Sequence, residues 1–339
     1  MPYNPPMSQD PRTPKLPVAR PVRRRRQPRP GRMSGPALTR LKHTEMARKT
    51  TRGKLTLMSG DGPKVPNALP EPPDRDDWRT TFRPDIPSSA RIYDYFLGGK
   101  DNYPADRDAG DQIAAYLPNI REAAQINRAF VRRAVRYLVN ETGIRQLIDI
   151  GTGLPTMGNV HEVAIAAHPA TRVVYVDHDP IVLAHARNML QGTPNAVIIG
   201  HDMRAPAGIL ADPELRRLVD FDEPAGVLFV SVLHFLADAD DPAAVIAELL
   251  APFPAGSYVA LTHGTADSAP QVRDAARVYD AATTRMFVRS REDVLALVRG
   301  LDVVPPGLVW TPEWRPEPGE QVVARPSDCY YYALVARKP

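Results

Sequence analysis

The 339-residue sequence contains a single cysteine, Cys329, and no apolar run as long as a membrane span. A lone cysteine excludes an intramolecular disulfide and a metal site built on cysteine thiolates. A transmembrane helix needs about 20 apolar residues, and every apolar run here is shorter. The first residues also lack the apolar core of a secretory signal, because Arg and Pro interrupt each short apolar stretch. These absences predict a soluble protein of the cytoplasm without membrane contact, and they give no indication of a metal site.

The body of the chain lacks an excess of positive charge. Residues 1–54 carry 15 Lys and Arg against two acids, whereas the remaining residues carry 28 against 37. An acidic body argues against nucleic-acid binding by the folded part, because such binding depends largely on Lys and Arg that neutralise phosphates. Residues 1–83 are rich in Pro and Arg and poor in large aliphatics, so we predict a disordered tail. Its four arginines at 23–26 form either a solvated segment or an arm for nucleic acid or an anionic membrane.

From residue 145 the sequence alternates short aliphatic runs with helical patterns, which is typical of a parallel sheet built from βαβ units. A helical insertion at about 268–301 separates five such strands from two late strand-like runs. We therefore predict an α/β, Rossmann-like core of seven strands over residues 144–339. The expected strands are 146–150, 172–176, 196–200, 226–232, 258–262, 308–311 and 330–336, and the expected helices between and after them are 160–167, 180–190, 206–219, 242–250, 271–286 and 291–301.

Residues 84–143 form a predicted helical cap that belongs to the same domain, 84–339. Its longer helix, expected at 119–139, has an apolar face and an opposite face marked by arginines, among them Arg128. The segment 88–103 combines aromatic residues, a Gly-Gly pair and alternating charges. It is either a binding loop or a short helix that docks through its apolar residues.

The first strand of the core ends in an acid and a glycine turn, Asp149-Ile150-Gly151-Thr152-Gly153. Glycines just past a buried strand let the backbone approach a ligand, and ligands bind at this edge of open α/β sheets. A dinucleotide fingerprint has a third glycine where this sequence has Thr156. A carboxylate at position 149 repels a pyrophosphate and attracts a cation. The pattern therefore favours a cationic nucleoside over NAD.

Two further acids follow the next two strands. Asp177 stands directly after the second strand, where a carboxylate can bind ribose hydroxyls, while Asp179 before Pro180 reads better as a helix N-cap. Asp202 follows the third strand and can accept a hydrogen bond from an adenine amino group while Met203 packs on the ring. Each acid alone could be a cap or a solvated residue. Three acids at successive strand ends favour a nucleotide site.

These segments resemble the motifs of class I S-adenosylmethionine-dependent methyltransferases. More narrowly, residues 88–107, 148–156, 175–180 and 232–236 resemble a bacterial S-adenosyl methyltransferase family that was first catalogued as a domain of unknown function. The resemblance covers about residue 84 to the C-terminus and leaves out the basic tail. It implies a seven-stranded, mostly parallel sheet with an antiparallel last strand, and S-adenosylmethionine as the cofactor.

The resemblance also implies roles for single residues. Asp149, Gly151 and Gly153 would surround the methionine end of the cofactor. Asp177 would hold the ribose, and Asp202 with Met203 would flank the adenine. His178 stands where the family usually has Asn. The candidate cofactor-binding residues are Asp149, Gly151, Thr152, Gly153, Asp177, His178, Asp202, Met203, Ser231, Tyr93 and Tyr95; the two tyrosines are included because aromatic faces attract a sulfonium as they do other cations.

The methyl acceptor is expected beside the fourth strand. His234 follows that strand and is either a base for an acceptor hydroxyl or amine, or a packed residue between Leu233 and Phe235. His263, after the fifth strand, is a second candidate. We predict methyl transfer to an O or N of a small molecule by in-line displacement, with alignment as most of the catalysis. The alternatives are a non-catalytic regulator that binds the cofactor, and an NAD-dependent oxidoreductase.

Overall fold

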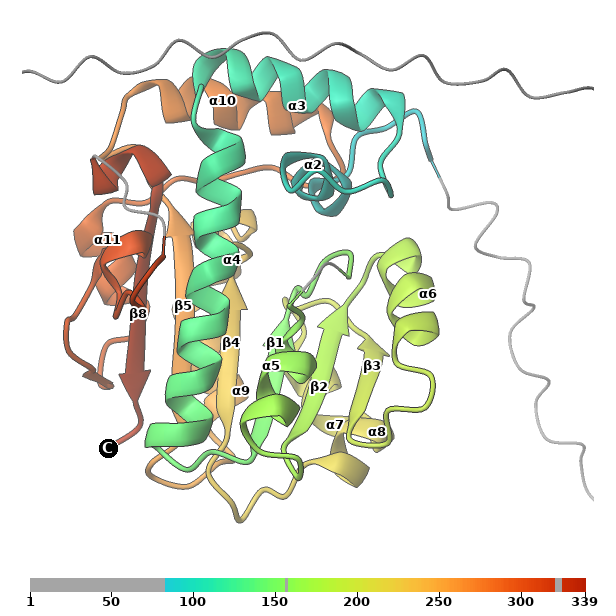
Figure 1. The fold of residues 1–339 in the computed structure, drawn as a ribbon, viewed down its shortest axis with the longest axis vertical. Coiled ribbons are helices and arrows are strands. Elements are labelled where there is room, and N and C mark those ends of the chain that lie inside the picture. Colours follow the sequence, from blue (N-terminus) through green and yellow to red (C-terminus); the bar gives the residue numbers. More distant parts are fainter. Residues whose placement is uncertain (1–82, 156–157, 321–324) are drawn as a thin grey trace, which may run out of the picture. The chain divides into compact units, whose positions relative to one another are not determined.

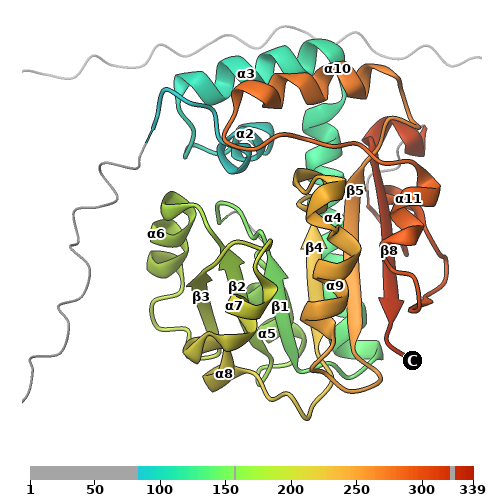
Figure 2. The ribbon, with the colours of Figure 1, turned by 180° about the vertical axis from the view of Figure 1, so that it is seen from behind.

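The computed structural model describes residues 83–155, 158–320 and 325–339, which all belong to one compact unit. The predicted tail, including the arginines at 23–26, lies outside the described residues except for residue 83. A central sheet carries helices on both faces, with α4 and α5 on one face and α7, α8 and α9 on the other (Figures 1 and 2). In the described ranges no helix is long and apolar enough to cross a membrane.

The sheet is mixed and mostly parallel, which confirms the predicted fold class. Its strand order is β3-β2-β1-β4-β5-β8-β6, with β7 also paired to β8. The five strands β1 to β5 are parallel, and β8 runs antiparallel to β5. The strands are β1 Gln146–Ile150, β2 Arg172–Asp177, β3 Ala196–Gly200, β4 Gly226–Val230, β5 Tyr258–Gly264, β6 Asp302–Val303, β7 Val309–Trp310 and β8 Tyr331–Arg337.

The described residues form eight strands where seven were predicted, because the outer partner of β8 is interrupted. Val303 of β6 pairs with Ala336, and Val309 of β7 pairs with Ala333 further along the same strand. Between the two pieces lie Pro305 and Pro306, which have no N–H to donate to a ladder. The two short strands are therefore two halves of one edge strand, of which the sequence pattern revealed only the second.

Helices in the described residues follow the prolines and caps predicted from sequence, with some earlier ends. The predicted helix 206–219 breaks at Asp212, whose side chain accepts from two backbone N–H groups and caps the next helix. The predicted helix 271–286 ends at Val278, and the predicted helix 291–301 ends at Ala296. The helices are α2 Ser89–Phe96, α3 Pro104–Tyr116, α4 Ile120–Arg136, α5 Val160–Ala167, α6 Pro180–Met189, α7 Pro206–Ala211, α8 Pro213–Leu218, α9 Pro242–Leu250, α10 Gln271–Val278 and α11 Arg291–Ala296.

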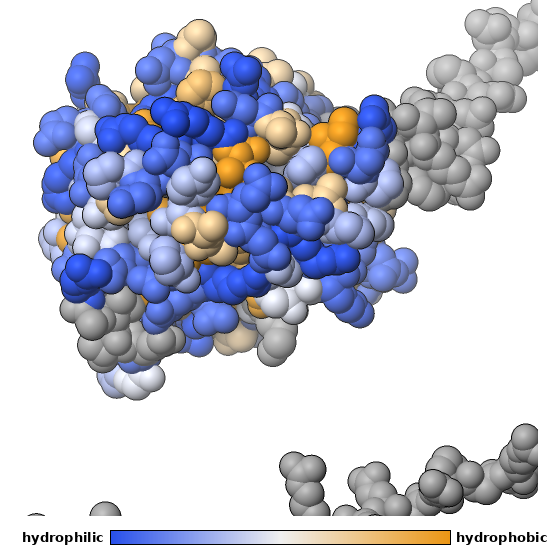
Figure 3. Space-filling view, turned by 90° about the horizontal axis from the view of Figure 1, so that it is seen from above, coloured by the Kyte–Doolittle hydropathy of each residue, from blue (hydrophilic) through white to orange (hydrophobic). Residues whose placement is uncertain are grey.

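The cap lies over the carboxyl ends of the parallel strands. It consists of α2, α3 and the start of α4, joined by α10 from the late insertion, which lies beside α3 (Figures 1 and 2). The cap has its own apolar core, whose members include Ile92, Phe96 and Tyr331. Seen from above, this face is mainly hydrophilic, with small separated hydrophobic patches (Figure 3). The cap therefore folds onto the sheet edge where the sequence places its candidate site.

Candidate functional site

A cavity lies between the cap and the carboxyl ends of β1, β2 and β4. Its volume is about 120 Å³. Ligand pockets commonly measure roughly 300–1,000 Å³, so the surrounding residues must move apart to admit a nucleoside. The structure brings ten of the predicted site residues to this one cavity: Tyr93, Asp149, Gly151, Thr152, Gly153, Asp177, His178, Met203, Ser231 and His234.

The glycine turn after β1 requires glycine at its first position for two reasons. Gly151 has a φ of 66°, in the left-handed region, and a Cβ there would lie 2.2 Å from Val232 Cγ2. Gly153 has the same φ, but a Cβ there would meet nothing within 4 Å. Its N–H donates instead to Asp177 Oδ2, at 2.9 Å. The turn is thus held close to the sheet on one side and to the end of β2 on the other.

Asp177 is already engaged by the backbone. Besides Gly153, the N–H groups of His178 and Asp179 donate to its Oδ1, at 2.8 and 3.0 Å. Burial raises the pKa of this carboxyl, and the backbone donors oppose the rise. A carboxylate has about four acceptor positions, so one remains for a ligand hydroxyl. Binding two ribose hydroxyls requires that one backbone donor be released.

Asp149 and Arg128, whose charges have opposite signs, both line the cavity at the methionine end predicted from sequence. Burial raises the pKa of Asp149 to about 7, although the Arg128 charge and a hydrogen bond from Thr152 oppose that rise. Arg128 reaches the cavity from α4 and donates to the Gly158 carbonyl at 3.2 Å. Its Nε is buried and has no partner among the described residues. An acid and a cation with a free donor suit a ligand that carries both an ammonium and a carboxylate.

The sequence pattern placed Arg128 on the outer face of its helix, and its place in the site was missed. The neighbouring Asn127, assigned to the apolar face, also lines the cavity and is fully buried. Asn127 donates to the Tyr93 hydroxyl at 2.9 Å, and its Oδ1 has no partner in the described part of the chain. Buried polar atoms normally have partners. Two such atoms beside one cavity indicate that a polar ligand completes the site.

Tyr93 and Tyr95 lie on opposite sides of α2, so only Tyr93 lines the cavity. Residues two apart on a helix differ by about 200° in direction. The Tyr95 hydroxyl donates to Asp111 at 2.7 Å, and its ring lies under the Arg121 guanidinium, 4.2 Å from it. The structure therefore does not support Tyr95 as a residue of this cavity, and the segment 88–103 contains the docked helix that was one of its two interpretations.

Asp202 is also absent from the residues that line the cavity. Its carboxylate accepts from the backbone N–H of Arg204 at 2.9 Å and pairs with that side chain at 3.2 Å. This local turn directs the acid toward its own loop. Met203 and Arg204 line the cavity in its place, and Arg204 also donates to the Phe235 carbonyl at 3.2 Å. The predicted adenine contact of Asp202 is therefore not supported, whereas Met203 lines the cavity, as its predicted place beside the adenine requires.

The acceptor side contains Ser231 and His234 at the end of β4. Ser231 has a φ of 56°, which is strained for a residue other than glycine, and its N–H donates to Thr262 Oγ1 at 2.9 Å. His234 is buried, which lowers its pKa well below the usual value.

His263 lies behind His234 and does not line the cavity. Both ring nitrogens of His263 are engaged, by Arg289 at 3.1 Å and by the Gly264 carbonyl at 2.8 Å. The structure does not support His263 as a catalytic residue.

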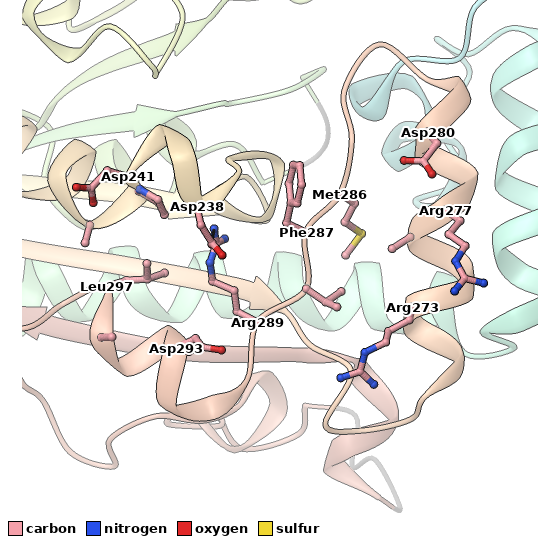
Figure 4. Close-up of a pocket in the computed structure, with 15 residues that line it drawn as sticks. Asp238, Asp241, Arg273, Arg277, Asp280, Met286, Phe287, Arg289, Asp293 and Leu297 are labelled. Atoms are coloured by element: carbon pink, nitrogen blue, oxygen red, sulfur yellow. Dashed lines mark hydrogen bonds and ion pairs between the residues drawn. The ribbon is translucent and has the colours of Figure 1, made fainter.

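A second cavity of about 550 Å³ lies beside the site, between α9, α10 and α11 (Figure 4). Arg273 and Arg277 line it from α10, and Arg289 points toward Asp238 on the opposite wall (Figure 4). Met286 lines both cavities. The segment that carries Met286 therefore separates the second cavity from the acceptor side of the first.

Most of the chain matches a known protein family. The family described as S-adenosyl methyltransferase matches residues 77–339. The chain belongs to this family. No curated protein matches it. A Streptomyces avermitilis protein of the DUF574 family is 42% identical over 76% of this chain and 100% of its own length, with a TM-score of 0.73. A candidate methyltransferase from Thermobifida fusca is 36% identical over 80% of this chain and 99% of its own, with a TM-score of 0.71.

Because the chain belongs to this family, it is an enzyme, an S-adenosyl methyltransferase that uses S-adenosylmethionine as its cofactor. This excludes the alternative of an NAD-dependent oxidoreductase. The residues of the cavity fit that cofactor. The unpartnered Arg128 Nε and Asn127 Oδ1, the acid Asp149 and the glycine turn provide a donor, an acceptor, a negative charge and close backbone approach. The residues that would hold the cofactor stay predictions.

Proposed function

We propose that this methyltransferase transfers the methyl group to an oxygen or nitrogen of a small-molecule acceptor that binds beside His234. The observation that carries the proposal is the meeting of the glycine turn, Asp177 and His234 in one cavity beneath the cap. That cavity is enclosed by cap and sheet residues of the same chain, which favours a small acceptor over a polymer. The acidic balance of residues 55–339 also favours an acceptor other than nucleic acid.

The proposed roles follow the contacts of each side chain. Asp149 would hold the cofactor ammonium and Arg128 its carboxylate, while the remaining acceptor position of Asp177 would take a ribose hydroxyl. Met203 would pack on the adenine. S-adenosylmethionine, when bound, supplies a sulfonium methyl that is open to in-line displacement. The protein then contributes by fixing the acceptor beside that methyl and by excluding water beneath the cap, since positioning alone can supply much of such a rate.

The proposal is tested first by calorimetry with S-adenosylmethionine and its demethylated product. We expect micromolar binding by the full chain, weakened by Asp177→Ala and unchanged by Asp202→Asn, which removes the charge of an acid outside the cavity. A folded sample that binds neither compound would contradict the cofactor roles.

Methyl transfer is then tested with isotopically labelled S-adenosylmethionine and fractionated small-molecule extracts. We expect a labelled product in at least one fraction, and none with protein or nucleic-acid fractions. Cofactor binding without labelled product in any fraction would favour the non-catalytic regulator instead. A salt-dependent shift of DNA that disappears on deletion of residues 1–54 would identify the basic tail as a nucleic-acid arm.

A further inference from the structure

The turn that carries His234 is held from behind by the segment between the two cavities. The N–H of Phe287 donates to the His234 carbonyl at 2.7 Å. Arg289, whose side chain is 6% exposed, donates to the carbonyls of Leu233 at 3.3 Å and Leu236 at 2.9 Å and pairs with Asp238 at 2.7 Å. Figure 4 shows this guanidinium pointing from the segment toward Asp238. Arg289 therefore contacts the backbone on both sides of His234.

The same guanidinium fixes the tautomer of His263. Arg289 Nη1 lies 3.1 Å from His263 Nε2. An arginine can only donate, so Nε2 accepts and carries no hydrogen. The hydrogen of the neutral ring is then on Nδ1, which lies 2.8 Å from the Gly264 carbonyl and donates to it. Burial lowers the pKa of His263 to about 4, so the ring is neutral at pH 7.

The backbone N–H of Gly264 fixes the other tautomer in His234. The Gly264 N–H donates to His234 Nδ1 at 3.3 Å. A backbone N–H can only donate, so Nδ1 accepts, and the hydrogen of the neutral imidazole is on Nε2. No described residue accepts a hydrogen bond from Nε2. Because His234 lines the first cavity, the ring presents an N–H donor there and not a lone pair.

We propose that His234 is a fixed hydrogen-bond donor to an oxyanion of the methyl acceptor, and that Arg289 is the positioning residue that holds the turn around His234 through the carbonyls of Leu233 and Leu236. The assignment of the oxyanion to the acceptor rests on the proposed function. A ring with hydrogen on Nε2 cannot remove an acceptor proton through that nitrogen. A carboxylate oxygen needs no such base: its lone pair forms the new C–O bond, the electron pair of the broken C–S bond goes to sulfur, and no proton moves.

The chemistry of His234 favours oxygen over nitrogen as the acceptor atom. An amine nitrogen has one lone pair, which the new bond to carbon uses, so it cannot also accept from His234. A carboxylate keeps further lone pairs for the Nε2–H group. The neighbouring walls are aromatic, with the His234 ring centroid 4.5 Å from that of Phe235 and 6.1 Å from that of Tyr331. The acceptor class that fits is an aromatic carboxylate.

Nitrogen-15 NMR of the histidine rings in the full-length protein tests the tautomers directly. We expect hydrogen on Nε2 of His234 and on Nδ1 of His263 between pH 6 and 8, with the signals assigned from His234→Gln and His263→Gln. Hydrogen on Nδ1 of His234, a mixture of tautomers, or a charged His234 ring at pH 7 would overturn the proposal.

Arg289→Lys tests the positioning role, because lysine keeps the charge and loses the planar fork. We expect both tautomers to stay, because the Gly264 carbonyl and N–H still hold them. We expect the His234 Nε2–H signal to shift and broaden, because the carbonyls of Leu233 and Leu236 lose their donor. Arg273→Lys is the matched control: Arg273 lines the same second cavity, and its side chain has no ion pair with a described residue. An unchanged His234 signal in a folded Arg289→Lys variant would overturn the role of Arg289, and the wild-type spectrum tests the tautomers even if that variant does not fold.

Sodium benzoate is the probe for the oxyanion, added to protein saturated with the demethylated cofactor. We expect it to shift the His234 Nε2–H signal, whereas methyl benzoate, which has the same ring and no charge, leaves the signal in place. No shift with benzoate would overturn the acceptor class. Calorimetry on the same sample separates the proposed function from the proposed donor role of His234. A failure to bind the demethylated cofactor contradicts the proposed function. The histidine tautomers of the free protein still test whether His234 is a donor.

Discussion

The backbone N–H of Gly153 donates to Asp177 Oδ2 over 2.9 Å, and this bond ties the glycine turn after β1 to the end of β2. Asp177, which is predicted to hold the ribose, thus also holds the neighbouring glycine turn in its conformation. Its two functions compete for the same oxygens, and substitutions there should affect stability and binding together.

Asp177→Ala should weaken cofactor binding and destabilise the free protein, each by about 1–3 kcal/mol, because it leaves three backbone N–H groups without their acceptor. Asp177→Asn keeps one side-chain oxygen and should cost less in both measurements. Calorimetry gives the binding term and urea denaturation the stability term. A loss of affinity in Asp177→Ala with unchanged stability would show that the backbone contacts contribute nothing.

Gly151→Ala and Gly153→Ala form a matched pair, since the two residues share a φ of 66°. Gly153→Ala should cost only the left-handed backbone penalty, about 1–2 kcal/mol. Gly151→Ala adds a clash with Val232 and should cost about 1–3 kcal/mol more. Denaturation curves of both variants measure the difference. Gly151→Ala should cost less in a Val232→Ala background, and equal costs in the two backgrounds would argue against the clash.

Cofactor affinity should rise with pH between 6 and 8. Burial raises the pKa of Asp149 to about 7 in the free protein, whereas a bound cation favours the carboxylate. Binding below that pKa therefore releases a proton, and affinity should increase by up to about tenfold per pH unit before it levels off above pH 7. Calorimetry in buffers of different ionisation enthalpy counts the released protons. Asp149→Asn should abolish the dependence and Asp202→Asn should keep it; a flat profile in the wild type would refute the assignment.

Two ion pairs of the cap should differ sharply in their contribution to stability. Arg91 and Asp106 lie 2.8 Å apart with side chains 4% and 0% exposed, whereas Arg121 and Asp111 lie 3.2 Å apart and are 43% and 63% exposed. Arg91→Leu leaves a buried carboxylate without its cation and should cost about 3–5 kcal/mol. Arg121→Leu should cost less than about 1 kcal/mol. Urea denaturation compares them, and similar costs would contradict the role of burial.

The parts of the site that follow strands could be predicted from sequence, because aliphatic runs reveal strand ends and parallel strands bring those ends to one edge. Asp149, Gly151, Asp177, Met203 and His234 were predicted in this way, and all five line the cavity. Side-chain direction after a strand could not be predicted in the same manner. Asp202 turns toward its own loop through a hydrogen bond with the Arg204 N–H, and such local turns have no periodic signal.

Contributions from the cap were harder to predict, since they depend on how helices cross the sheet edge. Arg128 carries a charge on a helix whose other face is apolar, and the pattern therefore assigned it to solvent. Tyr93 and Tyr95 looked equivalent because the segment had no clear period; only its helical conformation separates them. The first half of the interrupted edge strand, Asp302–Val303, was missed because two residues are too few for an alternation to be seen.

The cap is attached to the core more strongly on one side than on the other, and this difference affects how fast a bound molecule dissociates. On one side α4 continues from the cap into the packed core, where Phe130 and Leu138 are fully buried. Toward α6 the described contacts include a hydrogen bond from Ser88 to Asp179 at 3.2 Å and an approach of His185 to Asp101 at 3.7 Å. Breaking polar contacts of this kind costs far less than unpacking a helix. Dissociation is therefore expected to proceed by opening toward α6, with a rate sensitive to salt and to substitution of Ser88.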